Sequence, residues 1–203
     1  MHDDLVRSGY DRMAHDYLAW RDQFKNLPHL ADLTTRLRPG ASVLDVGCGA
    51  GVPVARYLVE RGFAVTGLDV SQVQVALARE HVPGASFDVR DMRQIQPGAY
   101  TVDAVVSFYA IFHTPREQHA DILRTLATCL VPGGFLPVTL GADTWEGVEP
   151  FHGVEMYWSH YGPEENRAMA AAAGLVIVRD VIDTSGGERH HVLLVQKAPE
   201  GPS

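Results

Sequence analysis

The sequence predicts an α/β fold in which helices cover both faces of a doubly wound, mostly parallel sheet. Two observations lead to this prediction. A short apolar run at 43–46 leads into glycines at 47, 49 and 51, and a segment with helical spacing follows at 53–61. Further short apolar runs then alternate with helical segments along the chain, as they do in repeated βαβ units.

Composition indicates one globular domain spanning 1–203, with 46% hydrophobic and 21% charged residues. The net charge of -8 and the lack of a dense Lys/Arg run argue against a nucleic-acid partner. Cys48 and Cys129 lie far apart and without metal-ligand spacing, which favours a reducing compartment, no disulfide and no metal site. The sequence has no signal-peptide pattern and no apolar run of about 18 residues, so we expect a soluble, cytoplasmic protein without membrane contact.

The expected elements follow one another in a regular order. Two amphipathic helices occupy residues 1–38, the second at about 23–37, ahead of the first strand and its glycine turn. Strands are expected at 63–68, 85–89, 102–107 and 135–140, and helices at 72–81, 116–130 and 164–173. The chain ends in two strands, 175–183 and 190–197, joined by a turn.

The spacing of the glycines distinguishes between nucleotide-binding motifs. A dinucleotide fingerprint needs a small residue at position 52, where this chain has Val52, so an NAD-dependent oxidoreductase is disfavoured. No Lys-Ser or Lys-Thr pair follows, so the turn is not a P-loop. The pattern D-x-G-x-G-x-G, at Asp45, Gly47, Gly49 and Gly51, resembles motif I of the class I S-adenosylmethionine-dependent methyltransferases. The alternative is a merely tight strand-to-helix turn.

This resemblance implies a Rossmann-like, seven-stranded sheet whose last strand is antiparallel. The Val-Pro-Gly-Gly sequence at 131–134 also resembles a signature of the family, which precedes its fifth strand. The implied cofactor is S-adenosyl-L-methionine, with S-adenosyl-L-homocysteine as product. The residues that we expect to bind it are Tyr10, Tyr17, Asp45, Gly47, Cys48, Gly49, Gly51, Asp69, Val70, Ser71, Asp91, Met92, Ser107 and Phe108.

Two acidic residues that follow strands are the main polar candidates. Asp69 lies about one βαβ unit beyond the glycine turn, where a carboxylate can accept hydrogen bonds from both ribose hydroxyls. Ser71 is expected to cap the next helix, and a second cap is the alternative role for Asp69. By resemblance, Asp91 accepts from the adenine amine and the Met92 N–H donates to the ring. An aspartate in such a turn is also common for local reasons.

The first helix carries a second pattern of the family. Tyr10, Asp11, Ala14 and Tyr17 match Y-D-x-x-A-x-x-Y, which by resemblance brings an aromatic hydroxyl near the methionyl end of the cofactor. The alternative is that Tyr10 and Tyr17 are core-facing aromatics seven residues apart.

Two segments are expected to face the reaction. The loop after the fourth strand, 107–113, emerges beside the proposed cofactor and supplies the candidate catalytic residues Tyr109 and His113. The segment 141–162 is rich in aromatic residues and is interpreted as a substrate lid, with His160 as a third catalytic candidate. A loop packed over the sheet edge is its alternative. The substrate residues expected in it are Trp145, His152, Tyr157 and Trp158.

These patterns lead to one functional hypothesis and one alternative. The hypothesis is methyl transfer from S-adenosylmethionine to an O, N, S or C atom of a small-molecule metabolite, by a monomer or homodimer. A hydroxyl acceptor would benefit from a histidine base, for which His113, His152 and His160 are available, although each is also explained as a packed or surface histidine. The sequence Ser107-Phe-Tyr-Ala110 lacks the tetrad associated with adenine-amino methylation. The alternative is a cofactor-binding protein that does not methylate, either a regulator or a cyclase-like relative.

Overall fold

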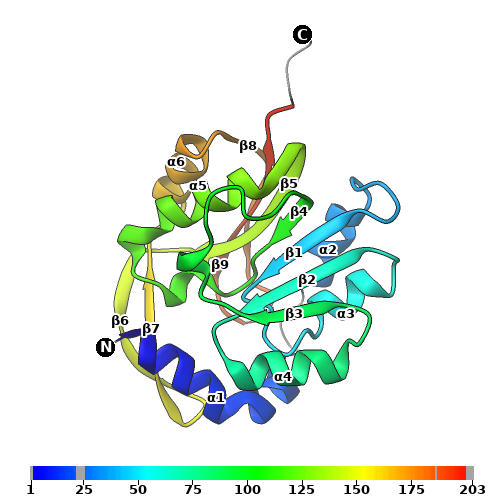
Figure 1. The fold of residues 1–203 in the computed structure, drawn as a ribbon. Helices are drawn as coiled ribbons and strands as arrows, with labels where there is room; N and C mark the ends of the chain where they lie inside the picture. The colour runs from blue at the N-terminus through cyan, green and yellow to red at the C-terminus, as the bar shows by residue number, and fades with distance from the viewer. Residues whose placement is uncertain (1, 22–25, 186, 200–203) are drawn as a thin grey trace.

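The structure, a computed structural model, describes residues 2–21, 26–185 and 187–199. A seven-stranded sheet forms its centre (Figure 1). Its strands are β1 (Ser42–Val46), β2 (Ala64–Asp69), β3 (Ser86–Val89), β4 (Val102–Val106), β5 (Leu130–Gly141), β8 (Leu175–Asp183) and β9 (His190–Lys197). The helices are α1 (His2–Arg21), α2 (Leu27–Thr34), α3 (Val54–Val59), α4 (Gln72–His81), α5 (His119–Cys129) and α6 (Pro163–Ala172), with short 3-10 turns η1 (Met92–Gln94), η2 (Ile111–His113) and η3 (Arg116–Gln118).

The sheet has the strand order β3-β2-β1-β4-β5-β9-β8. The strands β1 to β5 pair in parallel, whereas β9 is antiparallel to both β5 and β8. The predicted doubly wound sheet with an antiparallel last strand is therefore confirmed. The chain order reverses between β1 and β4, and in open α/β sheets ligands bind at the carboxyl ends of the strands at this point.

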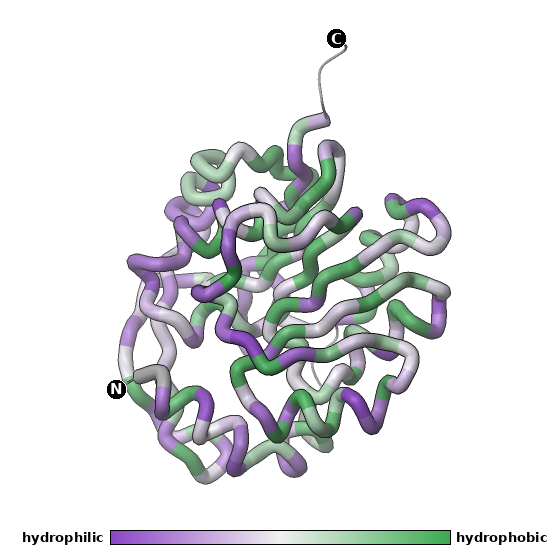
Figure 2. Tube along the Cα trace, in the orientation of Figure 1, coloured by the Kyte–Doolittle hydropathy of each residue, from purple (hydrophilic) through white to green (hydrophobic). Residues whose placement is uncertain are grey.

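Two apolar layers cover the sheet. Alternate residues of a strand point to opposite faces, so that Val43 packs with α2, α3 and α4, whereas its neighbour Leu44 packs with α5 and α6. Both faces are thereby buried, which explains why the central strands are nearly continuous apolar runs (Figure 2). The polar ends of these strands are left for a binding site.

The segment 141–162, interpreted above as a substrate lid, contains a β-hairpin whose strands were not expected from the sequence. Its strands β6 (Trp145–Phe151) and β7 (Val154–His160) pair antiparallel, with Phe151 opposite Val154. The connecting residues His152 and Gly153 have φ of 47° and 77°, and two positive φ angles are what a type I′ turn requires. The strands were missed because the aromatic residues of this segment do not alternate clearly with polar ones.

The hairpin packs against α1 (Figure 1). Val6, Met13 and Tyr17 of the helix form one apolar cluster with Met156 and Tyr157 of β7. A Cβ atom at Gly9 would lie 2.9 Å from Cε of Met156, so this glycine permits a close approach. The hairpin and α1 together form a wall beside the carboxyl ends of the strands.

Several boundaries differ from those expected. The second N-terminal helix was expected from about residue 23, but residues 22–25 lie outside the described residues and α2 begins at Leu27. The helix after the glycine turn is shorter than 53–61, and β5 already begins at Leu130 rather than after the 131–134 turn. Among the described helices, none has both the length and the hydropathy needed to cross a membrane.

Candidate active site

A cleft of about 700 Å³, including its open mouth, lies at the carboxyl ends of β1, β2 and β3. Residues from α1, the glycine turn, η1 and the loop after β4 line it, so that segments far apart in the sequence meet there. Of the residues expected to bind the cofactor, those that line this cleft are Tyr10, Tyr17, Gly47, Gly49, Asp69, Val70, Asp91 and Met92.

The glycine turn is held close to β2 and to the loop after β4. The N–H groups of Gly47 and Cys48 both donate to the carbonyl of Leu68, at 2.8 and 3.0 Å. Gly47 has a φ of 78°, and a Cβ atom there would lie only 2.2 Å from Cβ of Ala110. Gly49, with a φ of 53°, lines the cleft. Only glycine satisfies both demands at position 47, a left-handed backbone and the close neighbour.

Asp69 ends β2 and points back toward the glycine turn. Its two carboxylate oxygens accept hydrogen bonds from the N–H groups of Gly49, at 2.8 Å, and Ser71, at 2.9 Å. These bonds fix the carboxylate at the edge of the cleft. An ionised carboxylate has about four acceptor positions, so this one can also bind a diol.

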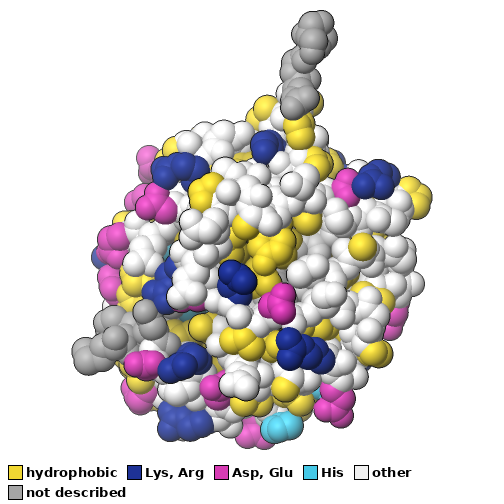
Figure 3. Space-filling model, in the orientation of Figure 1, with side chains coloured by type: hydrophobic (Ala, Val, Ile, Leu, Met, Phe, Trp, Pro, Cys, Tyr) yellow, Lys and Arg dark blue, Asp and Glu magenta, His cyan; other side chains and the backbone are white. Residues whose placement is uncertain are grey.

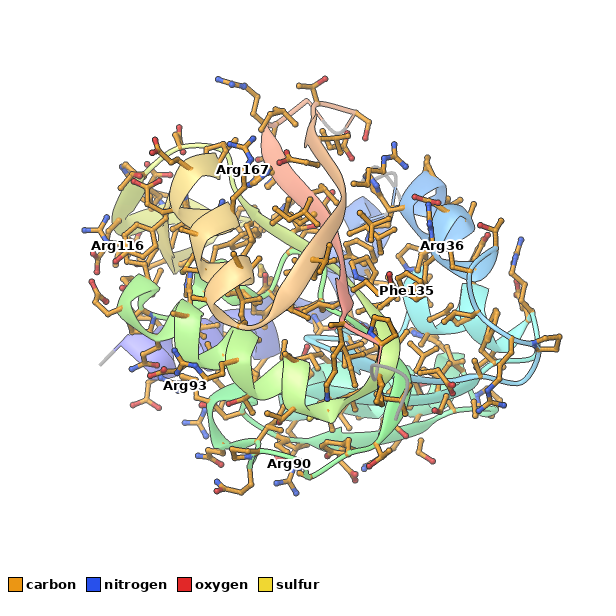
Figure 4. All side chains as sticks on the ribbon, turned by 90° about the horizontal axis from the view of Figure 1, so that it is seen from above. Arg36, Arg90, Arg93, Arg116, Phe135 and Arg167 are labelled. Carbon is orange, nitrogen blue, oxygen red and sulfur yellow. The ribbon has the colours of Figure 1, made fainter. Side chains whose placement is uncertain are left out.

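Asp91 is paired with a cation that the sequence analysis did not single out. The Arg93 Nε lies 2.9 and 3.0 Å from the two carboxylate oxygens, and Nη2 of the same guanidinium also donates to Asp91. Burial alone would raise the pKa of Asp91, but the hydrogen bonds and charge of Arg93 outweigh it and hold the pKa below its ordinary value. Arg90 and Arg93 both line the cleft and lie on the same side of the molecule (Figure 4).

Three of the expected cofactor residues instead hold the scaffold beside the cleft. Ser71 is fully buried, where its hydroxyl donates to Asp11 at 2.6 Å and accepts from the N–H of Gln74, capping α4. Ser107 is also buried, and its hydroxyl donates to the carbonyl of Val46 at 3.0 Å. The Phe108 ring lies in the core that covers one face of the sheet.

The remaining three expected cofactor residues, Asp45, Cys48 and Gly51, do not line the cleft but support the glycine turn. Asp45 and Cys48 are buried at the end of β1 and in the turn. A Cβ atom at Gly51 would meet Val82 at 3.1 Å and Phe87 at 3.2 Å, so this glycine serves the packing of α4 on the sheet. The motif is therefore divided between residues that line the cleft and residues that shape it.

His113 joins three elements at the inner end of the cleft. Its Nδ1 lies 3.0 Å from the backbone carbonyl of Tyr157, and its Nε2 lies 2.7 Å from the hydroxyl of Tyr10. A carbonyl can only accept, so Nδ1 carries the proton of the neutral ring and Nε2 is the acceptor. The Tyr10 hydroxyl therefore donates to His113.

A second, narrower space lies beside the cleft, with an empty volume of about 240 Å³ that includes its opening to solvent, and we call it the aromatic chamber. Its lining is mostly aromatic and consists of Tyr10, Tyr17, Tyr109, Phe112, His113, Phe151, Trp158, Glu188 and His190. Tyr10, Tyr17, Tyr109 and His113 also line the cleft, so these four side chains form the boundary between the two spaces.

Tyr109 has an unusual backbone at this boundary. Its φ is 57°, which is costly for a residue with a side chain. The ring is buried and meets the His190 ring edge-on, with centroids 4.8 Å apart. The strained backbone thus directs an aromatic side chain between the cleft and the chamber.

An outer vestibule of about 850 Å³ continues from the aromatic chamber toward solvent. It shares Phe112, Phe151, Trp158, Glu188 and His190 with the chamber. Trp145 and His160 line the vestibule, and Nδ1 of His160 lies 2.7 Å from the backbone carbonyl of Asp143. His160 is thus in neither the cleft nor the chamber, unlike His113.

Two of the four expected substrate residues lie away from these cavities. Tyr157 is buried in the cluster between β7 and α1, and its hydroxyl donates to Glu146 at 2.7 Å. His152 is exposed at the tip of the hairpin. Neighbouring residues of a strand point to opposite faces. Tyr157 faces α1, and Trp158 therefore faces the chamber.

The turn between β8 and β9 supplies two chamber residues that the sequence analysis missed. The Nε2 of His190 lies 3.6 Å from a carboxylate oxygen of Glu188. Burial lowers the pKa of His190 to about 4 and raises that of Glu188, although the nearby His152 opposes the latter shift. The sequence gives little indication of a role for Glu188 and His190, because an acidic residue and a histidine after two glycines are also typical of an ordinary surface turn. Among the described residues, no group of three or more His, Cys, Asp or Glu side chains could hold a metal ion.

Comparison with known proteins agrees with this geometry. A family model described as a methyltransferase domain matches residues 43–134, from β1 to the start of β5. The chain is 29% identical over 199 residues to the ubiquinone biosynthesis O-methyltransferase of Chromobacterium violaceum, covering 85% of this chain and 83% of that protein. It is 35% identical over 166 residues to the trans-aconitate 2-methyltransferase of Methylobacterium nodulans, covering 79% of this chain and 60% of that protein.

These matches support a class I S-adenosylmethionine-dependent methyltransferase. A solved structure agrees in fold: that of the Burkholderia thailandensis 1,6-didemethyltoxoflavin-N1-methyltransferase, which contains 1,6-didemethyltoxoflavin and S-adenosylhomocysteine. It is 22% identical and superposes with a TM-score of 0.75 over 95% of this methyltransferase and 87% of that chain. The cofactor of the family is S-adenosylmethionine.

The cleft of this methyltransferase fits that cofactor. The fixed carboxylate of Asp69 suits a ribose diol, and Val6, Val70 and Met92 provide apolar contacts for an adenine ring or a thioether. The turn at Gly49 leaves backbone, rather than a side chain, beside the ligand.

Proposed function

We propose that this methyltransferase transfers the methyl group of S-adenosylmethionine to a nucleophilic atom of a small-molecule metabolite bound in the aromatic chamber. The observation that carries the proposal is the boundary shared by the cleft and the chamber, formed by Tyr10, Tyr17, Tyr109 and His113. A methyl group and its acceptor must come into contact, and adjoining sites with a common wall allow this. The relatives named above, a methyltransferase of ubiquinone biosynthesis and one of trans-aconitate, support a small-molecule acceptor.

The residues that line the cleft would hold the cofactor. Asp69 would accept hydrogen bonds from the ribose hydroxyls, and Gly47 and Gly49 would leave room for the ligand above the turn. Asp91 and Met92 would lie along the adenine ring, with Arg93 sharing the Asp91 carboxylate. When bound, S-adenosylmethionine supplies a methyl group on a positively charged sulfur.

Orientation is the main contribution that the protein itself can make. A thiolate, a carboxylate or an unprotonated amine needs no base, and for such acceptors the walls of the chamber would act by holding the nucleophile toward the cleft. The strained Tyr109 and the ring of Trp158, which lies 4.4 Å from that of His113, would set this direction.

A hydroxyl acceptor has a proton to lose, and Tyr10 and His113 offer a path for it. The acceptor O–H would donate to the Tyr10 oxygen, which already donates to Nε2 of His113. As the acceptor oxygen forms its new bond to carbon, its proton passes to Tyr10, and the Tyr10 proton passes to Nε2. Tyr10 ends neutral and His113 ends as an imidazolium, which later releases its proton to solvent.

The test is to incubate the protein with S-adenosylmethionine carrying a labelled methyl group and a pool of metabolites. We expect one or more metabolites to gain one labelled methyl group by mass spectrometry, with an equal release of S-adenosylhomocysteine. The Asp69→Ala variant is the control, because it should lose both signals together. Binding of the cofactor without a labelled product across metabolite pools would instead favour the cofactor-binding alternative.

The proposal extends to where the enzyme works. Both cysteines are free and buried, which is compatible with a reducing compartment such as the cytoplasm. On the face shown in Figure 3, acidic and basic side chains are interspersed rather than gathered in one basic patch. A small molecule therefore suits the enzyme better than a nucleic acid.

A further inference from the structure

The aromatic chamber has walls that suit a flat ligand. The Phe151 ring meets Trp158 edge-on, with centroids 5.1 Å apart and planes at 86°, and it meets Tyr17 at 6.1 Å and 60°. The Phe112 ring also contacts Trp158, with centroids 5.5 Å apart and planes at 38°. Rings in this arrangement present both faces and edges to a bound molecule, and a conjugated ring can pair with either.

The charges around the chamber select against an acid. In the part of the chain that the structure describes, neither lysine nor arginine lines this cavity, and Glu188 is its only acidic residue. His190 is uncharged at neutral pH because burial lowers its pKa to about 4. A carboxylate entering the chamber would lose water and meet Glu188, and none of the described side chains of the lining would offer it a guanidinium or ammonium partner. Among the described residues, Arg189 lines the outer vestibule, and Arg90 and Arg93 line the cofactor cleft, but none of the three lines the chamber.

We propose that the methyl acceptor is a planar, conjugated molecule without a carboxylate, held with its ring against Phe151 and Trp158 and its nucleophilic group toward Tyr10. The inference rests on the proposed function, because it names the acceptor class of the same site. Any bulk of the acceptor beyond the ring would extend past Phe112 into the vestibule.

Three probes with related skeletons test this. They are 2-naphthol, the 2-naphthoate anion and the saturated alcohol 2-decalol, which separate charge from planarity. Binding is measured by calorimetry at neutral pH with S-adenosylhomocysteine present. We expect 2-naphthol to bind at least ten-fold more tightly than either of the others. Equal or tighter binding of 2-naphthoate or 2-decalol, or no measurable binding of 2-naphthol, would overturn the inference.

Variants locate the binding within the chamber. Trp158→Leu should weaken the binding of 2-naphthol at least ten-fold. Tyr57→Leu is the control: it removes an aromatic ring of α3 that lies under Arg61, away from the chamber, and should not change this binding. Because loss of a large ring can impair folding, Glu188→Lys provides a second arm on a half-exposed side chain. It should tighten 2-naphthoate at least ten-fold and leave 2-naphthol within about three-fold. Unchanged preferences in folded Glu188→Lys would show that Glu188 does not exclude acids.

The outcome can be separated from that of the proposed function. Labelled methyl transfer to an acyclic acid would overturn the inference and leave the methyltransferase function standing. Binding of 2-naphthol with the expected preferences, but no methyl transfer to any metabolite, would keep the chamber as a site for planar ligands and remove the proposed function.

Discussion

The hydroxyl oxygen of Tyr10 lies 2.7 Å from Nε2 of His113, a bond that crosses from the N-terminal helix α1 to the turn after β4. The other ring nitrogen, Nδ1, donates to the carbonyl of Tyr157, so Nε2 accepts from the Tyr10 hydroxyl. The pair is therefore set up as a proton path in one direction, from the boundary of the cleft into the imidazole.

The first prediction concerns this path, for a hydroxyl acceptor. His113→Gln should lower turnover about 10²-fold, and Tyr10→Phe should lower it by roughly ten-fold or more, because each interrupts the transfer of the same proton. The double variant should be no slower than His113→Gln, since the two residues act as one unit. Both losses should shrink as the pH rises and the acceptor ionises unaided.

Steady-state kinetics with saturating cofactor, together with calorimetry for cofactor affinity, provide the measurement. Tyr10→Phe keeps the ring that lines the cleft, so its affinity for S-adenosylmethionine should stay within about two-fold of the parent. Additive losses in the double variant, or losses that do not depend on pH, would contradict a shared proton path.

The second prediction concerns the Asp69 carboxylate. Asp69→Ala removes the acceptor for the ribose and also frees the N–H groups of Gly49 and Ser71 from their partner. Affinity for S-adenosylmethionine should fall by about 2 kcal/mol or more, roughly 30-fold. Asp88→Ala is the matched control, because it removes an equal charge from an exposed position on β3. A parental affinity in Asp69→Ala would remove this residue from the site.

The third prediction compares two glycines with similar backbones. Gly47 and Gly98 have φ of 78° and 71°, but a Cβ atom would be 2.2 Å from Ala110 at the first and would meet nothing within 4 Å at the second. Gly98→Ala should therefore lose only about 1 kcal/mol of unfolding free energy, from the backbone alone. Gly47→Ala should lose more and should also bind the cofactor more weakly. Similar stability and affinity in the two variants, measured by urea unfolding and calorimetry, would show that the turn can move away from Ala110.

The fold was predictable because the sheet is buried on both faces. Central strands such as those expected at 43–46 and 102–107 stand out as apolar runs, and the structure has strands at Ser42–Val46 and Val102–Val106. The hairpin β6–β7 was not predictable in this way. Its turn is His152-Gly153 rather than the more typical Asn-Gly, and both faces of β7 are at least partly covered, so that alternation of apolar and polar residues is weak.

The cleft was more predictable than the chamber. Residues that end parallel strands must meet at one edge of the sheet, which is why Asp69 and Asp91 were found from their positions. The contact between Tyr10 and His113 joins residues 103 positions apart and depends on how α1 packs against β7. Similarly, no local pattern tells which of Tyr157 and Trp158 faces the cavity, because only the pairing register of the hairpin decides it.

The fourth prediction concerns stability in acid. His119 is buried, its Nε2 lies 3.1 Å from the carbonyl of Thr114, and its Nδ1 has no hydrogen-bond partner among the residues that the structure describes. Burial lowers its pKa from 6.5 to about 4, so the folded state favours the neutral ring. The resulting stability is fully present above pH 6.5 and is lost as the pH falls toward 4, to a total of about 3 kcal/mol.

Urea unfolding at a series of pH values checks this effect. His119→Gln should show a smaller fall in unfolding free energy over that interval, because glutamine does not titrate. His15→Gln, at an exposed position of α1, should follow the parent. An identical pH dependence in the parent and in His119→Gln would mean that other groups cause the acid loss.

The last prediction separates the aromatic chamber from the vestibule and the core. Trp158 lines the chamber, His160 lines only the vestibule, and Tyr157 lies in the cluster against α1. Trp158→Leu should therefore raise the KM for the acceptor at least ten-fold. His160→Ala should change turnover by less than about three-fold, because its ring lines neither the cleft nor the chamber. Tyr157→Phe loses the bond to Glu146, so its effect should fall on stability, by about 1 kcal/mol, rather than on turnover.

All three variants should bind S-adenosylmethionine with parental affinity, because none of these side chains lines the cofactor cleft. Isothermal calorimetry for the cofactor and steady-state kinetics for the acceptor therefore report on different cavities. If His160→Ala slowed turnover as much as His113→Gln, the methyl transfer would have to occur in the vestibule, and the boundary at Tyr10 would lose its role. If Trp158→Leu weakened the cofactor and left the acceptor KM unchanged, the chamber would instead be an extension of the cofactor cleft.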